Sequence, residues 1–502
     1  MYPSQVRSKT RFRPFPLPED SQRWKEIGGK LDENDLGKIV ERQVNMLGRH
    51  VLDELYRGCG SLAYDPTAML KMVLYQYLKG NRSPAQWWRE AGLHEVMQWL
   101  GRGYAPARRT WYEFRDRLEG CIEGLHRQLI DRGMQEGHLD PSVGVQDGTS
   151  VAACASRHRM INEATLRKRR ALLAAVITGS HDASEALPKW MPPTGDGQQD
   201  LAARMETAAE VLAERIAQNG AKPSGKRKDP SKIVVSLTDP IAPLGRDKLK
   251  VYRPLYTIQY VVEPTSHLIL SYGCEPSVSD VGTLAPMIDK TQSIVGGRLQ
   301  TMLADAAYCT ILDLRDCEAR NVELLAPVQA NGLTEKKRQA KPSKQIPRNA
   351  FAWDEAERSY HCPEGHRLDY CGRERKRRHD GRTLFEYRYR CSPSRCEGCP
   401  RGTNCLSPGS AARTIKRLEG QERLDAQRDK MAQPEVQARY ALRGQTVERS
   451  FADAKGNRRL DRFHGRGPRR AQTETGLLVL AQNLLRLDRI EQTAPNHAET
   501  TT

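Results

Sequence analysis

Residues 142–154 read SVGVQDGTSVAAC, and they are the best starting point for predicting the fold of the chain. Apolar residues at positions 143, 145 and 151 predict a β-strand. Downstream, we expect strands at 232–237 (KIVVSL), 254–263 (PLYTIQYVVE) and 267–275 (HLILSYGCE), the last two joined as a hairpin across Pro264 and Thr265. A helix (279–296), a strand (299–308), a helix (313–321) and a strand (322–329) are expected after them. This order predicts a mixed-sheet α/β core.

Residues upstream of this core read as helices. In YDPTAMLKMVLYQYLKG, Asp65 suits an N-cap, Pro66 the first helical position, and Gly80 the end of the helix. Short helices with arginines on or beside them favour a helix-turn-helix-like DNA-binding domain, although a helical bundle with a solvated basic face fits the pattern equally well. The arginines concerned are Arg82, Arg89, Arg108, Arg109 and Arg115.

The changes of pattern predict several parts in the chain. They are a helical domain (1–135), a first part of the core (136–330) with a helical insertion at about 160–230, a basic cysteine-rich insertion (331–420), C-terminal core helices (421–490) and a disordered polar tail (491–502).

The charge of the chain indicates a polyanionic partner. Lysine and arginine total 80 against 62 acidic residues, a formal net charge of +18. Such an excess favours nucleic acid through binding to phosphates, and the alternative is a basic protein without that partner. The first twenty residues hold no apolar core of signal-peptide length, and no apolar run approaches a membrane span. We therefore expect a cytoplasmic protein with no membrane partner.

Cysteines crowd into the insertion between residues 362 and 405. Cys396 and Cys399 have the two-residue spacing of a zinc knuckle, and no second pair of equal clarity is present. The candidate zinc ligands are Cys362, Cys391, Cys396, Cys399 and Cys405, with His366 as a further alternative. Structural zinc and free cysteines stay as competing interpretations, and a reducing compartment argues against disulfides. The basic run from Arg373 to Arg378 fits either DNA contact or a solvated loop.

Three acids are placed where metal ligands would be useful. Asp147 lies within the first strand, Asp305 follows the apolar run TMLA, and Glu448 lies on an expected helix. Carboxylates hold Mg²⁺ (or Mn²⁺), and phosphodiester chemistry uses two such ions about 4 Å apart. The alternatives are a turn at Asp147 and a helix N-cap at Asp305.

Three further acids have simpler interpretations. Asp280 is expected to be the N-cap of the helix after the hairpin, Asp239 a turn residue before Pro240, and Glu474 a solvated residue of the last helix.

The acids lie in segments that resemble the three blocks of DDE transposases from bacterial insertion sequences. The segments are QDGTSVAACASRH (146–158), MLADAAYCTILDL (302–314) and residues 440–455. In the third block, Tyr440, Arg443, Glu448 and Lys455 follow the order found in that family. Four residues separate Arg443 from Glu448 where one well-known spacing has three. YDPTAMLKMVLYQYLKGNRS (64–83) is also similar to the family's helical N-terminal domain.

This resemblance implies an RNase H-like catalytic core with an all-helical N-terminal domain and insertions. It implies metal ligation by Asp147, Asp305 and Glu448, and DNA contacts by Tyr440, Arg443 and Lys455, to which the basic helices add Arg82 and Arg109. A seven-residue step would set Glu448 and Lys455 on one helix face. The implied partners are double-stranded DNA, as terminal inverted repeats and target, and further copies of the chain in a synaptic complex. The alternatives are a non-catalytic DNA-binding regulator with structural zinc and a metal-dependent nuclease without strand transfer.

Overall fold

The computed structural model describes residues 12–56, 61–181, 186–222, 224–329, 346–378 and 381–493. Most of the predicted linker after residue 331, and residues 494–502 of the predicted tail, lie outside this part. The chain forms two compact units, one of Met1–Leu303 with Ala441–Thr502 and the other of Ala304–Tyr440. Of the described residues, 48% are helical and 17% lie in strands, which confirms the predicted mixed α/β class.

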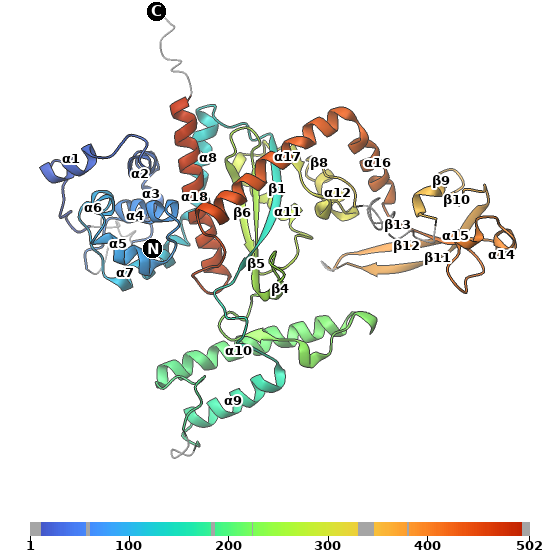
Figure 1. The fold of residues 1–502 in the computed structure, drawn as a ribbon, viewed down its shortest axis with the longest axis horizontal. Helices are drawn as coiled ribbons and strands as arrows, with labels where there is room; N and C mark the ends of the chain where they lie inside the picture. The colour runs from blue at the N-terminus through green and yellow to red at the C-terminus, as the bar shows by residue number, and fades with distance from the viewer. Residues whose placement is uncertain are drawn as a thin grey trace, which may run out of the picture. The chain divides into compact units, whose positions relative to one another are not determined.

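The first unit begins with a group of helices around a buried central one (Figure 1). The central helix is α4 (Pro66–Leu78), of which every residue except Thr67 is buried. It begins as predicted, because the Asp65 side chain accepts hydrogen bonds from the amides of Thr67 and Ala68. The other helices are α1 (Gln22–Gly29), α2 (Leu36–Asn45), α3 (His50–Asp53), α5 (Pro84–Ala91), α6 (Glu95–Leu100), α7 (Arg108–Leu118) and α8 (Ile122–Gln135).

The sheet of the first unit confirms the predicted first strand, the hairpin and the strand after the next helix, whereas the strand expected at 232–237 is only β3 (Val235–Ser236), which lies outside this sheet. β1 (Val143–Ala152) pairs antiparallel with β5 (Tyr252–Val262), which pairs antiparallel with β6 (Ile269–Glu275) as the predicted hairpin. β7 (Thr301–Leu303) joins the free side of β1 in parallel, and β4 (Leu244–Arg246) pairs with the start of β5. Three antiparallel strands followed by a parallel fourth beside the first are consistent with an RNase H-like core.

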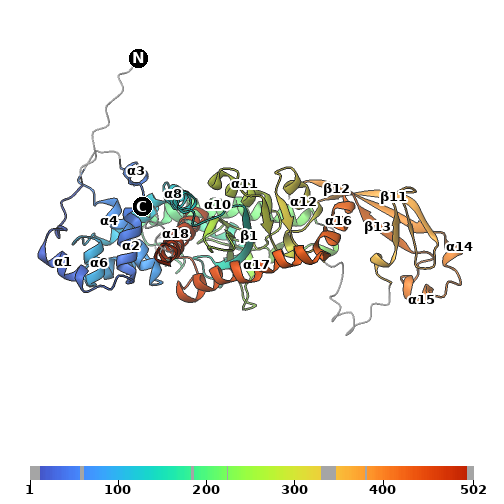
Figure 2. The same ribbon diagram turned by 90° about the horizontal axis from the view of Figure 1, so that it is seen from above.

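Two helices of the first unit pack against strand β6 of this sheet. α11 (Leu284–Val295) contacts β6, and so does α18 (Pro468–Thr493), which also packs against α8, α4 and α2. Figure 1 and Figure 2 both show α18 beside α8. Asn483 of α18 fixes the sheet edge, because its side chain bonds both the amide and the carbonyl of Ile269 at 2.9 Å.

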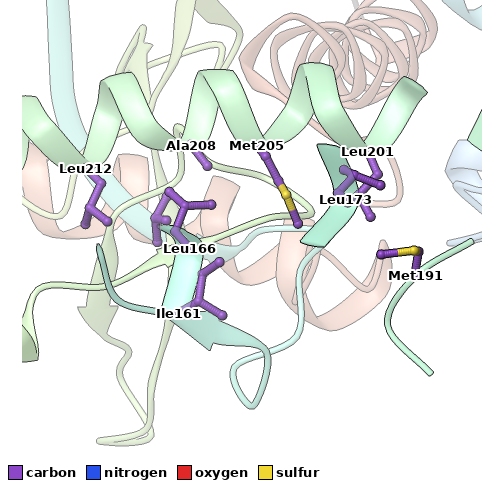
Figure 3. Close-up of a cluster of buried hydrophobic side chains, with 9 residues drawn as sticks. Ile161, Leu166, Leu173, Met191, Leu201, Met205, Ala208 and Leu212 are labelled. Atoms are coloured by element: carbon purple, nitrogen blue, oxygen red, sulfur yellow. The ribbon is translucent and has the colours of Figure 1, made fainter. Parts of the chain in front are cut away.

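The helical insertion after β1 has a hydrophobic core of its own (Figure 3). α9 (Glu163–Ile177) contributes Leu166 and Leu173, and α10 (Gly195–Gly220) contributes Leu201, Met205 and Leu212. The 3₁₀ turns η1 (Ser224–Lys226) and η2 (Pro230–Lys232) follow, and a short ribbon of β2 (Met160–Ile161) and β3 (Val235–Ser236) closes its base.

The second unit contains a small antiparallel sheet that the sequence did not predict. Its order is β13 (Thr414–Leu418), β12 (Thr383–Cys391), β11 (Arg367–Arg377), β10 (Ser359–His361) and β9 (Ala352–Asp354). The other elements are η3 (Ala306–Tyr308), α12 (Ile311–Glu318), β8 (Glu323–Leu325), η4 (Arg348–Ala350), α14 (Pro393–Cys396), α15 (Gly402–Cys405) and α16 (Gln421–Ala432).

The C-terminal helices expected from residue 421 begin with a short one. α16 ends at Ala432, and Pro434 begins a new helix, α17 (Pro434–Ala452), which runs from the second unit into the first. A π-helical turn, η5 (Asp453–Asn457), follows directly and contains Lys455. Regular α-helical spacing therefore does not continue from Glu448 to Lys455, and the expectation that both lie on one helix face stays a prediction.

Candidate functional site

Asp147 lies in the middle of β1, opposite Tyr260 of β5. Its side chain is 20% exposed, which leaves the carboxylate accessible on one face of the sheet. One carboxylate oxygen accepts from the amide of Gly148 at 2.7 Å, and the other accepts from Arg443 Nη2 at 3.1 Å. Because β1 continues through Gly148 to Ala152, the alternative of a turn at Asp147 was wrong.

Gly148 has a steric reason to be glycine. A Cβ atom there would lie 2.2 Å from Asp280 Oδ1 and 2.4 Å from Gln259 Nε2, which are joined by a hydrogen bond of 2.6 Å. Successive strand residues point to opposite faces, so Asp280 lies on the other face of β1 from Asp147. Asp280 is not the N-cap of α11, as had been expected: the N-cap is Thr283, whose hydroxyl donates to the carbonyl oxygen of Asp280 at 2.7 Å.

Two basic side chains from the C-terminal helices bind β1. Arg443, 16% exposed, makes the ion pair with Asp147, and Lys455 Nζ donates to Thr149 Oγ1 at 2.6 Å and to the Ser150 carbonyl at 3.2 Å. Burial lowers the pKa of Lys455. Phe451 anchors the end of α17 on the sheet, since its ring stacks on Tyr260 with the centroids 4.7 Å apart. Positive charge is thus held next to Asp147 by packing.

Glu448 lies on the exposed side of α17, although its neighbour Val447 is fully buried. Within the described residues its carboxylate has no hydrogen bond or ion pair. The carboxylate is therefore available to a ligand.

Asp305 belongs to the second unit and follows the end of β7 by two residues. It is the N-cap of η3, because its Oδ1 atom accepts from the Ala307 amide at 2.7 Å. The capping alternative is confirmed. It uses one carboxylate oxygen of a partly exposed side chain and so does not exclude ligation by the other.

The remaining predicted DNA contacts fall in different environments. Arg109 is exposed on α7, with 90% of its side chain accessible and an ion pair to Glu113. Arg82 is only 1% exposed and faces the buried Glu474, so its guanidinium has no surface to offer DNA. Glu474 is fully buried, and the expectation that it would be solvated was wrong. Tyr440 is half-buried in the last position of the second unit.

A basic cavity that the sequence did not reveal opens beyond the end of β1. Its volume is about 420 Å³, and segments far apart in the chain line it. The basic lining residues are Arg157, His158, Arg159, Arg253, Arg462 and Arg466. Arg253 is neutralised by Asp247 at 2.9 Å and Arg462 donates to the Ala155 carbonyl, whereas Arg157, Arg159 and Arg466 make no ion pair within the described residues. The cavity suits an anion.

Two protein-family models match the chain. A Transposase DDE domain matches residues 361–488, which include Glu448, Arg443 and Lys455. A Transposase domain (DUF772) matches residues 25–117, from within α1 into α7. A search of curated proteins found no match. None of the described helices combines the length and apolarity needed to cross a membrane.

Proposed function

Since the chain belongs to the DDE-type transposases of insertion sequences, we propose that it cleaves DNA at the ends of such an element and joins them to a target. One observation carries the proposal. In the parallel pair of β1 and β7, Val145 lies opposite Leu303, and an aspartate follows each of them after two residues. This order of strands and aspartates is the one that the family resemblance implies, and it supports the proposal that Asp147 and Asp305 are metal ligands.

The residues available fit hard divalent cations. Asp147, Asp305 and Glu448 would hold Mg²⁺ or Mn²⁺ through carboxylate oxygens, and each side chain is at least partly exposed. When bound, such ions activate the attacking water or 3′ hydroxyl and stabilise the leaving oxygen.

The basic residues beside Asp147 would position the reacting DNA strand. Arg443 orients the Asp147 carboxylate through its ion pair and can turn toward a phosphate when a cation takes over that carboxylate. Lys455 is fixed on Thr149 and Ser150, so its charge lies just beyond Asp147 along the same strand. Tyr440 would contact DNA from the first half of α17. We further propose that several copies of the chain hold two element ends and the target together.

The basic cavity provides a path for the DNA backbone away from the proposed centre. It begins at Cys154, two residues after the end of β1, and presents three arginines without ion pairs within the described residues. Phosphate groups would enter it, whatever the base sequence.

The double substitution Arg157→Gln with Arg159→Gln should weaken binding to duplex DNA of unrelated sequence. The logarithm of the affinity decreases as the logarithm of the salt concentration rises, and each phosphate contact contributes about 0.9 to the steepness of this slope. Loss of two contacts should therefore make the slope less steep by about 2. Fluorescence anisotropy over a range of salt concentrations measures it. The matched control is Arg167→Gln with Lys168→Gln, two exposed residues of α9 outside the cavity that remove the same charge. Equal slopes for the two doubly substituted proteins would show that the cavity holds no phosphate.

Two other functions make different predictions. A DNA-binding regulator with a structural zinc site would bind the element ends without cutting them. A metal-dependent nuclease would cut them without joining. The exposed Glu448, with Arg443 and Lys455 bound to β1, suits either enzyme better than the regulator.

Wild-type protein should cut a labelled DNA fragment at the boundary of the element in Mg²⁺ or Mn²⁺ and stop when EDTA removes the ion. With a pre-cut end carrying a 3′ hydroxyl, it should also form a joined product with target DNA. Cutting without joining would favour the nuclease. Specific binding with neither reaction would favour the regulator and overturn the proposal.

A further inference from the structure

Five cysteines of the second unit gather beside the small antiparallel sheet. Cys362 lies in the turn between β10 and β11, Cys391 ends β12, Cys396 and Cys405 end α14 and α15, and Cys399 lies between those helices. The core formed by Phe351, Tyr360, Leu368, Tyr389, Cys391 and Ile415 contacts Cys362, Cys396 and Cys405. All five cysteines are free thiols.

Two of these cysteines lie at the start of tight turns, and in the first of these turns a backbone amide donates to the cysteine sulfur. After Cys362, Gly365 adopts a φ of +76° and donates to the Cys362 carbonyl, and the amide of His366 donates to Cys362 Sγ at 3.3 Å. After Cys396, Gly398 adopts a φ of +69° and the amide of Cys399 donates to the Cys396 carbonyl. Left-handed glycines allow such turns, and N–H groups aimed at sulfur stabilise the thiolate form that metals bind.

The contacts distinguish Cys405 from Cys391 as the fourth ligand. Cys405 is partly exposed at the edge of the core and lies near Cys362, Cys396 and Cys399. Cys391 interacts with Cys396 and Cys362, but it is 3% exposed and forms part of the apolar core.

We propose that Cys362, Cys396, Cys399 and Cys405 bind one structural zinc ion, with Cys391 packed behind them. Four thiolates in a tetrahedron are the ligand set of structural zinc. Among the described residues, no three of the cysteine sulfur atoms lie within 4.8 Å of one another; Glu136, His138 and Glu491 are the group that meets this distance. The cysteine side chains must therefore rotate inward to form Zn–S bonds of about 2.3 Å. The ion would tie α14, α15 and the β10–β11 turn to a sheet whose own core has six buried residues. Small cores of this kind need such a staple.

Metal analysis of the full chain tests the proposal. Protein purified without chelator should contain about one zinc per chain, and Co²⁺ exchanged into it should give the intense thiolate-to-cobalt absorption of a four-sulfur site. Cys399→Ser should lose most of the zinc. Cys371→Ser is the matched control, because Cys371 is an exposed thiol in the bulge of β11, and it should keep the full content. Zinc absent from wild-type protein loaded with Zn²⁺ would overturn the proposal.

A footprint on unmodified protein covers the case in which the variant does not fold. Alkylation followed by mass spectrometry should label Cys371 at once and leave the four ligands protected until a chelator is added. Chelator-dependent labelling of Cys362, Cys396, Cys399 and Cys405 supports the site. Labelling of these four cysteines at the same rate with and without chelator contradicts it, whether or not the protein transposes DNA.

Discussion

Glu448→Gln should abolish cleavage of element ends in Mg²⁺ while the protein still binds them. The amide keeps the size of the side chain but removes the charge that a divalent cation requires. Loss of one metal ligand costs several kcal/mol of transition-state stabilisation, so the rate should fall by about 10²–10³-fold or more. Folding should be unchanged, because Glu448 is exposed and its carboxylate makes no hydrogen bond or ion pair within the described residues. Single-turnover cleavage with saturating protein measures the chemical step.

The control for this prediction is Glu435→Gln, an exposed glutamate in the first turn of the same helix. It removes the same charge from α17 and should leave the cleavage rate unchanged. If Glu448→Gln cuts DNA at the wild-type rate, Glu448 is not a ligand of the catalytic ions. If both variants lose activity equally, the effect belongs to the charge of α17.

The core strands could be predicted because their signals are local. Alternating apolar residues in β1 and two apolar runs around Pro264 and Thr265 identify the strand and the hairpin without knowledge of distant residues. The same locality explains the correct N-cap at Asp65, whose partners lie two and three residues along the chain. The three carboxylates could be named from the family resemblance, and their metal role stays a prediction.

The strands of the cysteine-rich region could not be predicted in this way. On β11, exposed Arg373, Arg375 and Arg377 alternate with Glu374 and Lys376, so charge lies on both faces. Pairing is supplied instead by cross-strand contacts, such as the ion pair between Glu374 and Arg388 of β12. A strand stabilised by charged partners lacks the apolar alternation that reveals most strands.

Arg82 shows how a long-range contact misleads interpretation of the sequence. A lone arginine beside a short helix is typical of a DNA-binding surface, and only the fold reveals Glu474, 392 residues further along the chain, as its partner. The basic cavity was missed for the same reason, because its arginines come from three separate segments.

Arg82→Ala should destabilise the protein by about 3–5 kcal/mol, because it leaves a buried carboxylate without its cation. Arg82 Nη1 lies 3.4 Å from Glu474 Oε2, and Nη2 donates to the carbonyls of Arg459 and Arg462 at 2.7 and 2.8 Å. Glu474 also accepts from the amides of His464 and Gly465. The pair therefore fixes the loop after η5 against α18. Denaturant unfolding measures the loss, and Arg109→Ala, an exposed arginine of α7, should stay within about 0.5 kcal/mol of wild type.

The loss in Arg82→Ala should be smaller in acid than at neutral pH. Burial raises the pKa of Glu474, while Arg82, the two backbone amides and Arg115 oppose the rise. Without Arg82 the pKa of Glu474 in the folded protein rises further above its value in the unfolded chain. Glu474 of the variant therefore takes up a proton on folding between these two pKa values, and the stability of the variant falls as the pH rises through this range. The loss at about pH 5 should therefore be smaller than at pH 8. Adding Glu474→Leu to Arg82→Leu should recover most of the stability and remove the pH dependence, because no buried charge then stays unpaired. An equal loss at both pH values would show that packing of the arginine, not its charge, stabilises the loop.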